Sequence, residues 1–361
     1  MHFGGGLARF YEDVTEGLKK RYRDVQPTIV SFDEVTAQRI QGLYSAYFLR
    51  NERMTGRVRA RHPTARTLPG LARILSTSDI IYAKDDILDL TLLILAGLFK
   101  KLPPIVIGFH TPIHYAKTPT IQATMHNVLY SSWYYRFLLS RASGFHVLNT
   151  YHETLLAQWF PKKPILKIHN PYKGALFKAT KTIPSAVLRL LWIGRLTKDK
   201  GFDDLIALID ETNNDHRRRI SWTIVGDGAM RTHVANLKKR CNNVTYFSSM
   251  KHTALATLYQ QHDAFVSTSK WECLPYTVLE AQLSGIPVIA YDIPGNADII
   301  DPKQTGYLVS TPADMKMAID SFKPTRLNGT TIRQHTLKKF HPETPYQHLY
   351  SFFTSFNAKS L

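Results

Sequence analysis

Short apolar runs alternate with amphipathic segments along most of the 361 residues. Runs of this length, bounded by turn residues, are typical of buried strands, and the segments between them repeat apolar side chains at helical spacing. The strands expected in the first half are 27–32, 79–83, 104–109, 144–148 and 165–169. Strands that alternate with helices predict a parallel sheet with helices on both faces.

The same alternation starts again after residues 172–186, a polar connection that we interpret as a domain boundary. The strands expected beyond it are 188–193, 221–225, 244–247, 264–266, 288–290 and 306–309. A chain of this length suits two domains of roughly 150–200 residues each. We expect one domain over 1–175, a second over 186–340, and a C-terminal helix within 341–361 that packs back toward the first domain.

Composition narrows the class of protein. The apolar fraction of 44% and the charged fraction of 20% are typical of a globular chain. The sequence has two cysteines, Cys241 and Cys273, so at most one disulfide can form, which favours a reducing cytoplasm. The N-terminal sequence MHFGGGLARF lacks the apolar core of a signal peptide, and no apolar run reaches the ~20 residues that span a bilayer. We therefore expect a cytoplasmic protein.

The net charge of +18 indicates an anionic partner, such as phosphate, an acidic membrane face or nucleic acid. Residues 1–180 carry 24 basic and 12 acidic side chains, so most of the excess lies in the first half. The segment 50–73 has seven arginines and one acid. Together with the aromatic residues Trp133, Tyr134, Tyr135 and Phe137, it suits attachment to an anionic membrane, to which each cation contributes about 1 kcal/mol. A basic surface without a membrane role is the alternative.

Two loops at predicted strand ends are candidates for phosphate binding. The loop that starts at Gly194 holds Arg195 and Lys200, and a planar guanidinium next to an ammonium suits a diphosphate. A solvated basic loop is the alternative. The sequence GDG from Gly226 also follows a strand, but Arg231 prevents a complete G-x-G-x-x-G, which argues against a nicotinamide dinucleotide.

Glu272 and Glu280 form the sharpest candidate pair. A helix that begins near Pro275 and stops at Gly285 places Glu272 in the preceding loop and Glu280 about a turn and a half inside, where both can face one cleft. A carboxylate accepts hydrogen bonds from two vicinal hydroxyls of a sugar or ribose, and the N–H groups at the helix start favour an anion. A surface acid with a salt bridge is the alternative.

Gly4, Gly5 and Gly6 precede a helical pattern through Lys20, and a glycine loop that opens a helix is suited to phosphate. In α/β proteins such a loop follows a strand. Almost nothing precedes this loop, so the usual first strand is missing from the prediction, and a flexible glycine terminus is the alternative. His110, at the end of a predicted strand, is a further candidate, with a histidine satisfied by backbone groups as its alternative.

The order of these motifs carries a family resemblance. The sequence GRLTKDKGFDDLI follows one strand, VGDG ends the next, and the two glutamates precede SGIPVIA. This order resembles family 4 of the retaining glycosyltransferases, strongly over 188–309 and more weakly over 1–180. The resemblance implies an α/β GT-B fold, in which two Rossmann-like, doubly wound domains face each other across a cleft. It places the acceptor on the first domain and the nucleotide-sugar on the second.

The resemblance also implies roles for individual residues. Arg195 and Lys200 resemble the ligands that balance the charge of the donor diphosphate. Glu272 resembles the residue that touches the donor sugar, and Glu280 the acid that holds the ribose. His110 resembles the histidine at the sugar and acceptor side. The other donor-binding positions that it implies are Gly5, Gly6, Gly194, Gly226, Leu274, Pro275 and Tyr276.

The reaction implied by the resemblance is transfer of a sugar from a nucleotide-sugar to an acceptor hydroxyl with retention at the anomeric carbon. Its products would be lipid-linked or cell-envelope glycans. Front-face attack needs no protein base, and the one acidic pair of note, Asp85-Asp86, opens a helix, so we expect no cofactor and no essential divalent metal. The expected partners are the donor, a glycan acceptor and the anionic inner face of a membrane, without nucleic acid.

Two other classes of function stay open. A catalytically silent GT-B scaffold subunit is favoured by the missing first strand and opposed by the intact motif residues. A nucleic-acid-binding protein is favoured only by the charge, since no groove-reading or RNA-binding motif occurs in the sequence.

Overall fold

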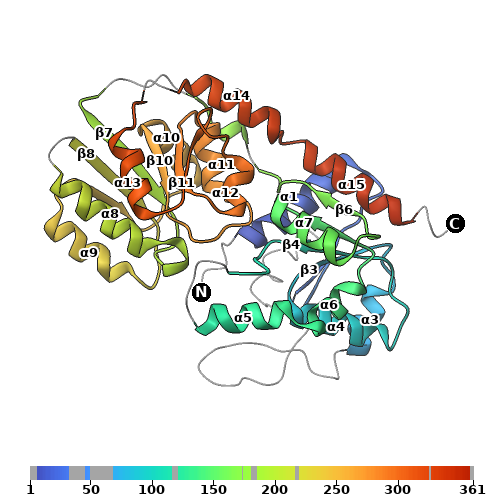
Figure 1. The fold of residues 1–361 in the computed structure, drawn as a ribbon. Coiled ribbons are helices and arrows are strands. Elements are labelled where there is room, and N and C mark those ends of the chain that lie inside the picture. The colour runs from blue at the N-terminus through green and yellow to red at the C-terminus, as the bar shows by residue number, and fades with distance from the viewer. Residues whose placement is uncertain are drawn as a thin grey trace. The chain divides into compact units, whose positions relative to one another are not determined.

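The computed structural model describes residues 6–31, 45–48, 68–115, 121–172, 174–179, 185–215, 219–324 and 327–357. The chain divides into two compact units (Figure 1). Unit 1 comprises Met1–Ile113, His126–Tyr172 and Glu343–Leu361, and unit 2 comprises His114–Met125 and Lys173–Pro342. Each unit is built around a parallel β-sheet.

Unit 1 contains a four-stranded parallel sheet in the order β3-β4-β5-β6. Its strands are β3 (Ile81–Lys84), β4 (Ile105–Phe109), β5 (Gly144–Val147) and β6 (Ile165–Lys167). Two further strands, β1 (Thr28–Ser31) and β2 (Ser45–Phe48), pair in parallel as a separate sheet. The helices of unit 1 are α1 (Gly6–Arg21), α3 (Leu68–Leu75), α4 (Ile87–Gly97), α6 (Trp133–Ser140), α7 (Thr150–Trp159) and α15 (Thr344–Asn357). Helix α5 (Ile121–Ser131) runs across the boundary between the units.

Polar side chains set where the helices of unit 1 begin. Asp86 caps α4 by accepting hydrogen bonds from the N–H groups of Leu88 and Asp89, so the acidic pair opens a helix as predicted. Ser132 caps α6 in the same way, by accepting a hydrogen bond from the N–H group of Tyr135, and separates α5 from α6. Strands β4 and β5 are buried beneath these helices, because nearly every residue in them is apolar.

The C-terminal helix α15 packs on α1 within unit 1. The buried residues that form this contact are Phe10, Val14, Leu18 and Leu349. Arg21 donates to both carboxylate oxygens of Glu343 at 2.7 Å, and its guanidinium lies 3.9 Å from the centre of the Tyr346 ring. The first and last helices of the described chain therefore belong to one core.

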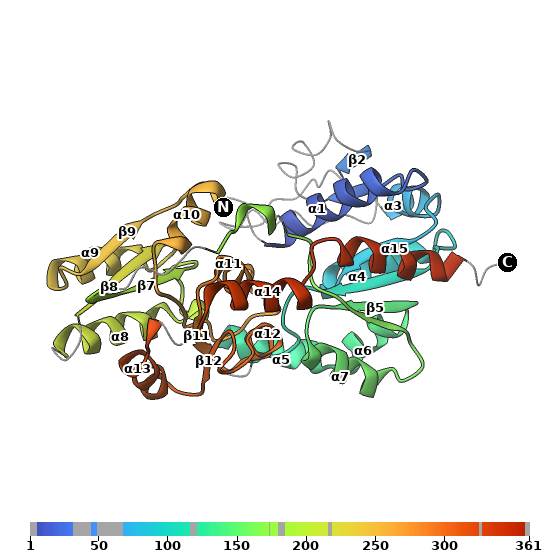
Figure 2. The same ribbon diagram turned by 90° about the horizontal axis from the view of Figure 1, so that it is seen from above.

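Unit 2 contains a six-stranded parallel sheet in the order β12-β11-β10-β7-β8-β9. Its strands are β7 (Val187–Ile193), β8 (Arg219–Val225), β9 (Val244–Phe247), β10 (Ala264–Ser267), β11 (Val288–Tyr291) and β12 (Gly306–Val309). Figure 2 labels all of these strands except β10. The chain adds β8 and β9 on one side of β7 and then returns to place β10 on the other side. Ligands of open α/β sheets bind at the carboxyl ends of the strands where the order reverses in this way. The ends of β7 and β10 are therefore the expected ligand site.

Helices follow the strands of unit 2 in turn. They are η2 (Gly174–Leu176), η3 (Lys198–Lys200), α8 (Phe202–Asn214), α9 (Arg231–Arg240), α10 (His252–Gln260), α11 (Tyr276–Leu283), α12 (Pro294–Ile299), α13 (Pro312–Asp320) and α14 (Gly329–Lys339). Two tryptophans, Trp192 and Trp222, anchor the core, and each donates its indole N–H to a threonine hydroxyl, at 3.0 and 3.2 Å. Cys241 and Cys273 are free and buried.

The apolar runs located the strands well, because every predicted strand is present with its ends shifted by at most two residues. Gly285 ends α11 with a φ of +78°, as predicted for a glycine stop. Strand β2 was not predicted. None of the helices in the described ranges combines the length and the apolar character that crossing a membrane requires.

Replacing Gly201 with alanine should destabilise unit 2. Gly201 has a φ of +62°, and a Cβ atom there would lie 1.9 Å from the carbonyl oxygen of Thr268. The left-handed conformation alone costs alanine about 1–2 kcal/mol, so we expect a total loss of roughly 2 kcal/mol or more in the free energy of unfolding. Urea denaturation followed by circular dichroism measures it.

The control is Gly70→Ala in α3, where a Cβ atom would meet nothing within 4 Å. Alanine is favoured over glycine inside a helix, so this variant should gain about 0.5–1 kcal/mol. Equal stability of Gly201→Ala and the unaltered chain would contradict the close approach of the two backbones.

Candidate functional site

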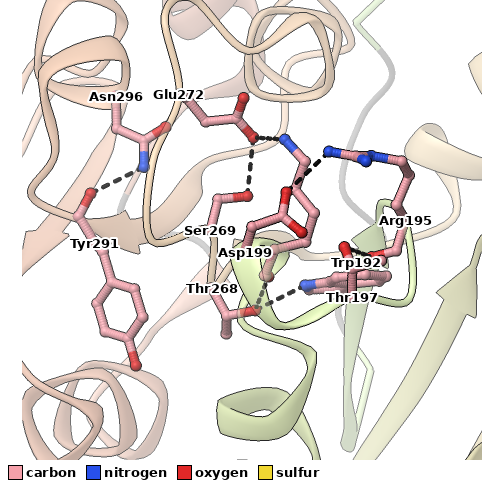
Figure 3. Close-up of polar contacts among 10 residues, drawn as sticks. Trp192, Arg195, Thr197, Asp199, Thr268, Ser269, Glu272, Tyr291 and Asn296 are labelled. Atoms are coloured by element: carbon pink, nitrogen blue, oxygen red, sulfur yellow. Dashed lines mark hydrogen bonds and ion pairs between the residues drawn. The ribbon is translucent and has the colours of Figure 1, made fainter. Parts of the chain in front are cut away.

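A cation–carboxylate pair lies where strands β7 and β10 end. Lys200 Nζ is 2.5 Å from Glu272 Oε1, and Ser269 Oγ donates to the same oxygen at 2.9 Å (Figure 3). The exposed fractions of the lysine and glutamate side chains are 19% and 14%. Charges shielded from water to this degree interact more strongly than charges on an open surface. The structure thus joins two residues that the sequence assigned to different parts of the donor.

Hydrogen bonds between two loops hold this pair in place. Thr268 Oγ1 accepts from Trp192 Nε1 and donates to the backbone oxygen of Lys200, each at 3.0 Å (Figure 3). The N–H group of Lys270 donates to the backbone oxygen of Asp199 at 3.0 Å. The loop after β7 is therefore fixed to the loop after β10, although 72 positions separate Lys200 from Glu272.

Arg195 lies in the same loop as Lys200 but in a more open environment. Its side chain is 68% exposed and pairs with Asp199 at 2.8 Å (Figure 3). An exposed pair four residues apart on the chain contributes only a few tenths of a kcal/mol. A ligand phosphate can therefore displace Asp199 from the guanidinium at little cost.

Gly194 and Gly226 allow the ends of β7 and β8 to approach closely. Gly226 has a φ of +150°, and a Cβ atom there would lie 1.8 Å from the carbonyl oxygen of Gly194. Beyond this contact, the N–H group of Leu196 donates to the backbone oxygen of Asp227 at 3.0 Å. The two glycines thus shape the loop that carries Arg195, and their direct contact with a donor stays a prediction.

Glu280 is buried in α11, with an exposed fraction of 4%. Its Oε1 is 2.7 Å from His252 Nε2, and its Oε2 accepts a hydrogen bond from the Tyr259 hydroxyl at 3.3 Å. Burial, and then the charge of Glu280, raises the pKa of Tyr259 well above its usual value, so the phenol keeps the proton that it donates. The sequence missed His252 and Tyr259, because no spacing connects α10 with α11 before the fold is known.

The start of α11 offers backbone N–H groups beside Glu272. Pro275 occupies the N-cap position and makes no side-chain hydrogen bond to the first turn, which begins at Tyr276. The N-terminus of a helix carries a partial positive charge and suits an anion. Helix α12 supports the preceding loop, since a Cβ atom at Gly295 would lie 2.6 Å from the backbone oxygen of Glu272. The helix start thus has a geometry that suits an anion. Backbone contacts of Leu274, Pro275 and Tyr276 with a donor stay a prediction.

In unit 1, His110 follows β4 and belongs to a chain of hydrogen bonds. His110 Nε2 is 2.8 Å from Tyr82 Oη, and His146 Nδ1 is 2.6 Å from the same oxygen. Burial, followed by the charges of His146, Lys84 and His152, lowers the pKa of His110 well below its usual value. His110 is therefore neutral at pH 7.

Asp85 follows β3 at the same edge of the sheet and is fully buried. Thr111 Oγ1 donates to its Oδ2 at 2.9 Å, and the Tyr135 hydroxyl donates to its backbone oxygen at 3.3 Å. Burial raises the pKa of Asp85 to about 7, although the Thr111 hydrogen bond and the charge of Lys84 oppose the shift. No role beyond the start of a helix was predicted for Asp85, since burial of a strand-end carboxyl leaves no local signal.

Two of the predicted features fall beyond the structure's description. Gly5 lies outside the described residues, and so does the basic segment 50–73 up to residue 67. Gly6 is the first residue of α1. Across the ranges that are described, no three His, Cys, Asp or Glu side chains are grouped as metal ligands are.

Residues 177–325, which lie within unit 2, match the family model of glycosyl transferases group 1. A GDP-mannose-dependent alpha-mannosyltransferase from Mycobacterium tuberculosis is 31% identical over 170 residues, which are 44% of this chain and 41% of that protein. A UDP-N-acetylglucosamine–peptide N-acetylglucosaminyltransferase GtfA subunit from Limosilactobacillus reuteri is 25% identical over 71% of this chain and 50% of that protein. The chain spans between about a quarter and a half of the length of the curated relatives that it matches.

Solved structures agree with the fold over nearly the whole chain. Sucrose-phosphate synthase from Thermosynechococcus elongatus has a TM-score of 0.75 at 18% identity, over 98% of this chain and 94% of that one. The Anabaena protein Alr3699/HepE, solved with UDP and glucose, has a TM-score of 0.72 at 17% identity, over 97% and 96% of the two chains. The prediction of an α/β GT-B fold is thereby confirmed.

Asp85→Asn should stabilise the protein increasingly as the pH rises from 4 to 8. The folded state raises the pKa of Asp85 from 3.8 to about 7, so it binds a proton that the unfolded chain releases above pH 4. The stability from this group is complete below pH 4 and is lost as the pH rises through 7, at a cost of roughly 4 kcal/mol. Asparagine does not titrate. The measurement is the difference in free energy of unfolding between variant and parent across this pH range.

Asp210→Asn is the control with the opposite sign. The hydrogen bond from Arg240 lowers the pKa of Asp210, so the parent gains stability from this group as the pH rises, and the variant loses it. A pH-independent difference for Asp85→Asn would contradict a raised pKa at Asp85.

Proposed function

We propose that this chain transfers a sugar from a nucleotide-sugar to an acceptor hydroxyl in the synthesis of a cell-envelope glycan. The observation that carries the proposal is the Lys200–Glu272 pair at the reversal of strand order in a group 1 glycosyltransferase domain. A cation for a diphosphate and a carboxylate for sugar hydroxyls are in direct contact there, and Glu272 precedes the start of α11 by a few residues. A nucleotide-sugar presents these two chemical groups next to each other.

Each side chain then has one task at the donor. Lys200 and Arg195 bind the diphosphate and stabilise the negative charge that builds up as it leaves, which is typically worth a few kcal/mol per good contact. Glu272 accepts hydrogen bonds from the transferred sugar. Glu280, oriented by His252 and Tyr259, accepts those of the ribose. His110 contributes from unit 1 at the sugar and acceptor side.

Relatives support a nucleotide-sugar donor. Those named above use GDP-mannose and UDP-N-acetylglucosamine, and the Anabaena neighbour was solved with UDP-glucose. The resemblance to the retaining family 4 supports transfer with retention, in which the leaving phosphate oxygen takes the acceptor's proton. We propose that the reaction needs no divalent metal, because the two cations Arg195 and Lys200 neutralise the leaving group.

A lipid-linked acceptor at the inner face of a membrane completes the proposal, and an apolar surface of unit 1 supports it. The side chains concerned are at least half exposed: Leu98 (77%), Phe99 (54%), Val128 (66%), Leu129 (52%) and Trp133 (78%). On α5, Val128 and Leu129 lie on the side opposite the buried Ala123 and Tyr130, so its apolar stripe faces away from the core. We call these five residues the apolar surface.

Exposed cations accompany the apolar surface. Lys100 and Lys101 directly follow Phe99, and Arg136 lies in α6 between Trp133 and Phe137. One of the four aromatic residues predicted to contact a membrane, Tyr135, is fully buried in the core, so the prediction was wrong for this residue. Exposed tryptophan with flanking lysine and arginine is typical of proteins that rest on anionic bilayers.

The correct nucleotide should stabilise the protein in a thermal-shift screen of UDP-, GDP- and ADP-sugars in EDTA. Binding to the native state at 100 times the Kd adds about 2.7 kcal/mol. Lys200→Met removes a charged hydrogen bond to the diphosphate, so the Kd should rise about 10–100-fold. Lys316→Met is the matched control, because Lys316 is as buried as Lys200 and pairs with Asp215 and Asp320 in the same unit. Stabilisation by no nucleotide, or only with Mn²⁺, would contradict the proposal.

Trp133→Glu should abolish flotation of the full chain with vesicles that contain phosphatidylglycerol. An apolar anchor becomes a charge that the anionic surface repels, whereas the parent chain should float at low salt. Met317→Glu in α13 of unit 2 makes the same change at a residue that is 61% exposed, and flotation should persist. Equal flotation of both variants would remove the apolar surface from the membrane contact.

A further inference from the structure

The hydrogen bonds around Tyr82 determine which atom carries each proton in the series that runs from the backbone oxygen of Ile168 through His146 and Tyr82 to His110. The backbone oxygen of Ile168 can only accept, so His146 Nε2, at 3.0 Å, carries a proton and donates it. Burial lowers the pKa of His146 to about 4, so its other nitrogen, Nδ1, is unprotonated at neutral pH. The Tyr82 hydroxyl therefore donates to His146 Nδ1 at 2.6 Å.

The direction of this first bond determines the second. A phenol has one proton, and Tyr82 uses it toward His146, so the Tyr82 oxygen must accept from His110 Nε2 at 2.8 Å. His110 is neutral, which leaves its Nδ1 as a bare lone pair. This nitrogen is buried and has no hydrogen-bond partner within the part of the chain that the structure describes.

Packing holds the three rings in this arrangement. A Cβ atom at position 108 would lie 1.8 Å from Tyr82 Oη, so Gly108 leaves the space that the phenol occupies. The Phe10 ring lies 4.2 Å from the His110 ring, measured between centroids. Neither histidine ring can turn over without losing a hydrogen bond, so the tautomer of His110 is set before any ligand binds.

We propose that Tyr82 and His146 are positioning residues that hold His110 in its Nε2–H tautomer, so that His110 Nδ1 accepts a hydrogen bond from a sugar hydroxyl. The proposal rests on the proposed function and deepens it, because it names the chemical group that His110 recognises. An unprotonated ring nitrogen attracts a hydroxyl proton and repels the oxygens of phosphate or a carbonyl. His110 thus recognises a carbohydrate hydroxyl and not a phosphate group.

A second buried polar atom at the same edge of the sheet suits the same class of ligand. Asp85 Oδ1 also has no hydrogen-bond partner among the described residues, while Oδ2 accepts from Thr111, the residue after His110. Strands β3 and β4 are neighbours, with Lys84 opposite Gly108, so both atoms follow paired strand ends. Because the pKa of Asp85 is raised to about 7, Oδ1 carries a proton and donates below that pH and accepts above it, and a hydroxyl can serve as either partner.

Nitrogen-15 NMR of the full chain labelled at histidine tests the proposal. Its resonances are assigned with His110→Asn. We expect the His110 Nδ1 shift of an unprotonated nitrogen from pH 8 down to pH 5. Tyr82→Phe should move it toward the average of the two tautomers, because Nε2–H loses its acceptor. Tyr350→Phe is the control, since it removes a hydroxyl that donates to Asp24 elsewhere in unit 1, and the shift should stay unchanged.

The ligand class is tested on the same resonance with methyl glycosides of glucose, galactose, mannose and N-acetylglucosamine, and with inorganic phosphate. At least one glycoside should move the Nδ1 resonance of the parent, and phosphate should not. The proposal would be overturned by a proton on Nδ1 in the parent or by an unchanged Nδ1 shift in Tyr82→Phe. It would also be overturned if phosphate alone moved the Nδ1 resonance, or if no glycoside moved it. Thermal stabilisation of the parent and of Tyr82→Phe by the nucleotide-sugar tests the donor site independently of His110. If neither protein is stabilised, the proposed function fails; if both are stabilised and the Nδ1 resonance does not respond to glycosides, only the role of His110 fails.

Discussion

The pairing of β7 with β10 is the constraint on which the candidate donor site depends. Leu190 and Leu191 lie opposite Ala264 and Phe265, so two loops distant in sequence leave the sheet side by side. Thr268 accepts a hydrogen bond from Trp192 and donates one to the backbone oxygen of Lys200. These two hydrogen bonds restrict where the Lys200 ammonium can lie. The site is thus a property of sheet topology first and of its charged side chains second.

The charged side chains of this site form two ion pairs that differ in their exposure to water. The Lys200–Glu272 pair is largely shielded from water, whereas the Arg195–Asp199 pair is mostly exposed. A ligand can therefore recruit the arginine by exchange at the surface while the lysine and glutamate stay oriented. In unit 1, by contrast, His110 and Asp85 follow two strand ends, and each has one buried polar atom without a hydrogen-bond partner among the described residues.

Local pattern located the strands of the two larger sheets and the starts of α4 and α11, since burial and capping act on neighbouring residues, but it missed β2. It placed Lys200, Glu272 and Glu280 at strand ends and in α11 for the same reason. It could not supply the partners of Glu280, because His252 and Tyr259 reach it only after α10 and α11 pack. Nor could it separate Trp133 from Tyr135, two aromatic neighbours of which one is exposed and the other buried. The His110–Tyr82–His146 chain was missed because its members come from three strands.

The place of α15 determines the order in which the chain can be completed during synthesis. Unit 1 contains the first helix and also the last, which covers the apolar residues Phe10, Val14 and Leu18 of α1. Domains fold as units when their residues have emerged from the ribosome. Unit 2 ends at Pro342, so it can close while α15 is still being made. Unit 1, whose first helix is translated before unit 2, is therefore completed after it, and its α1 surface stays uncovered until α15 has been made.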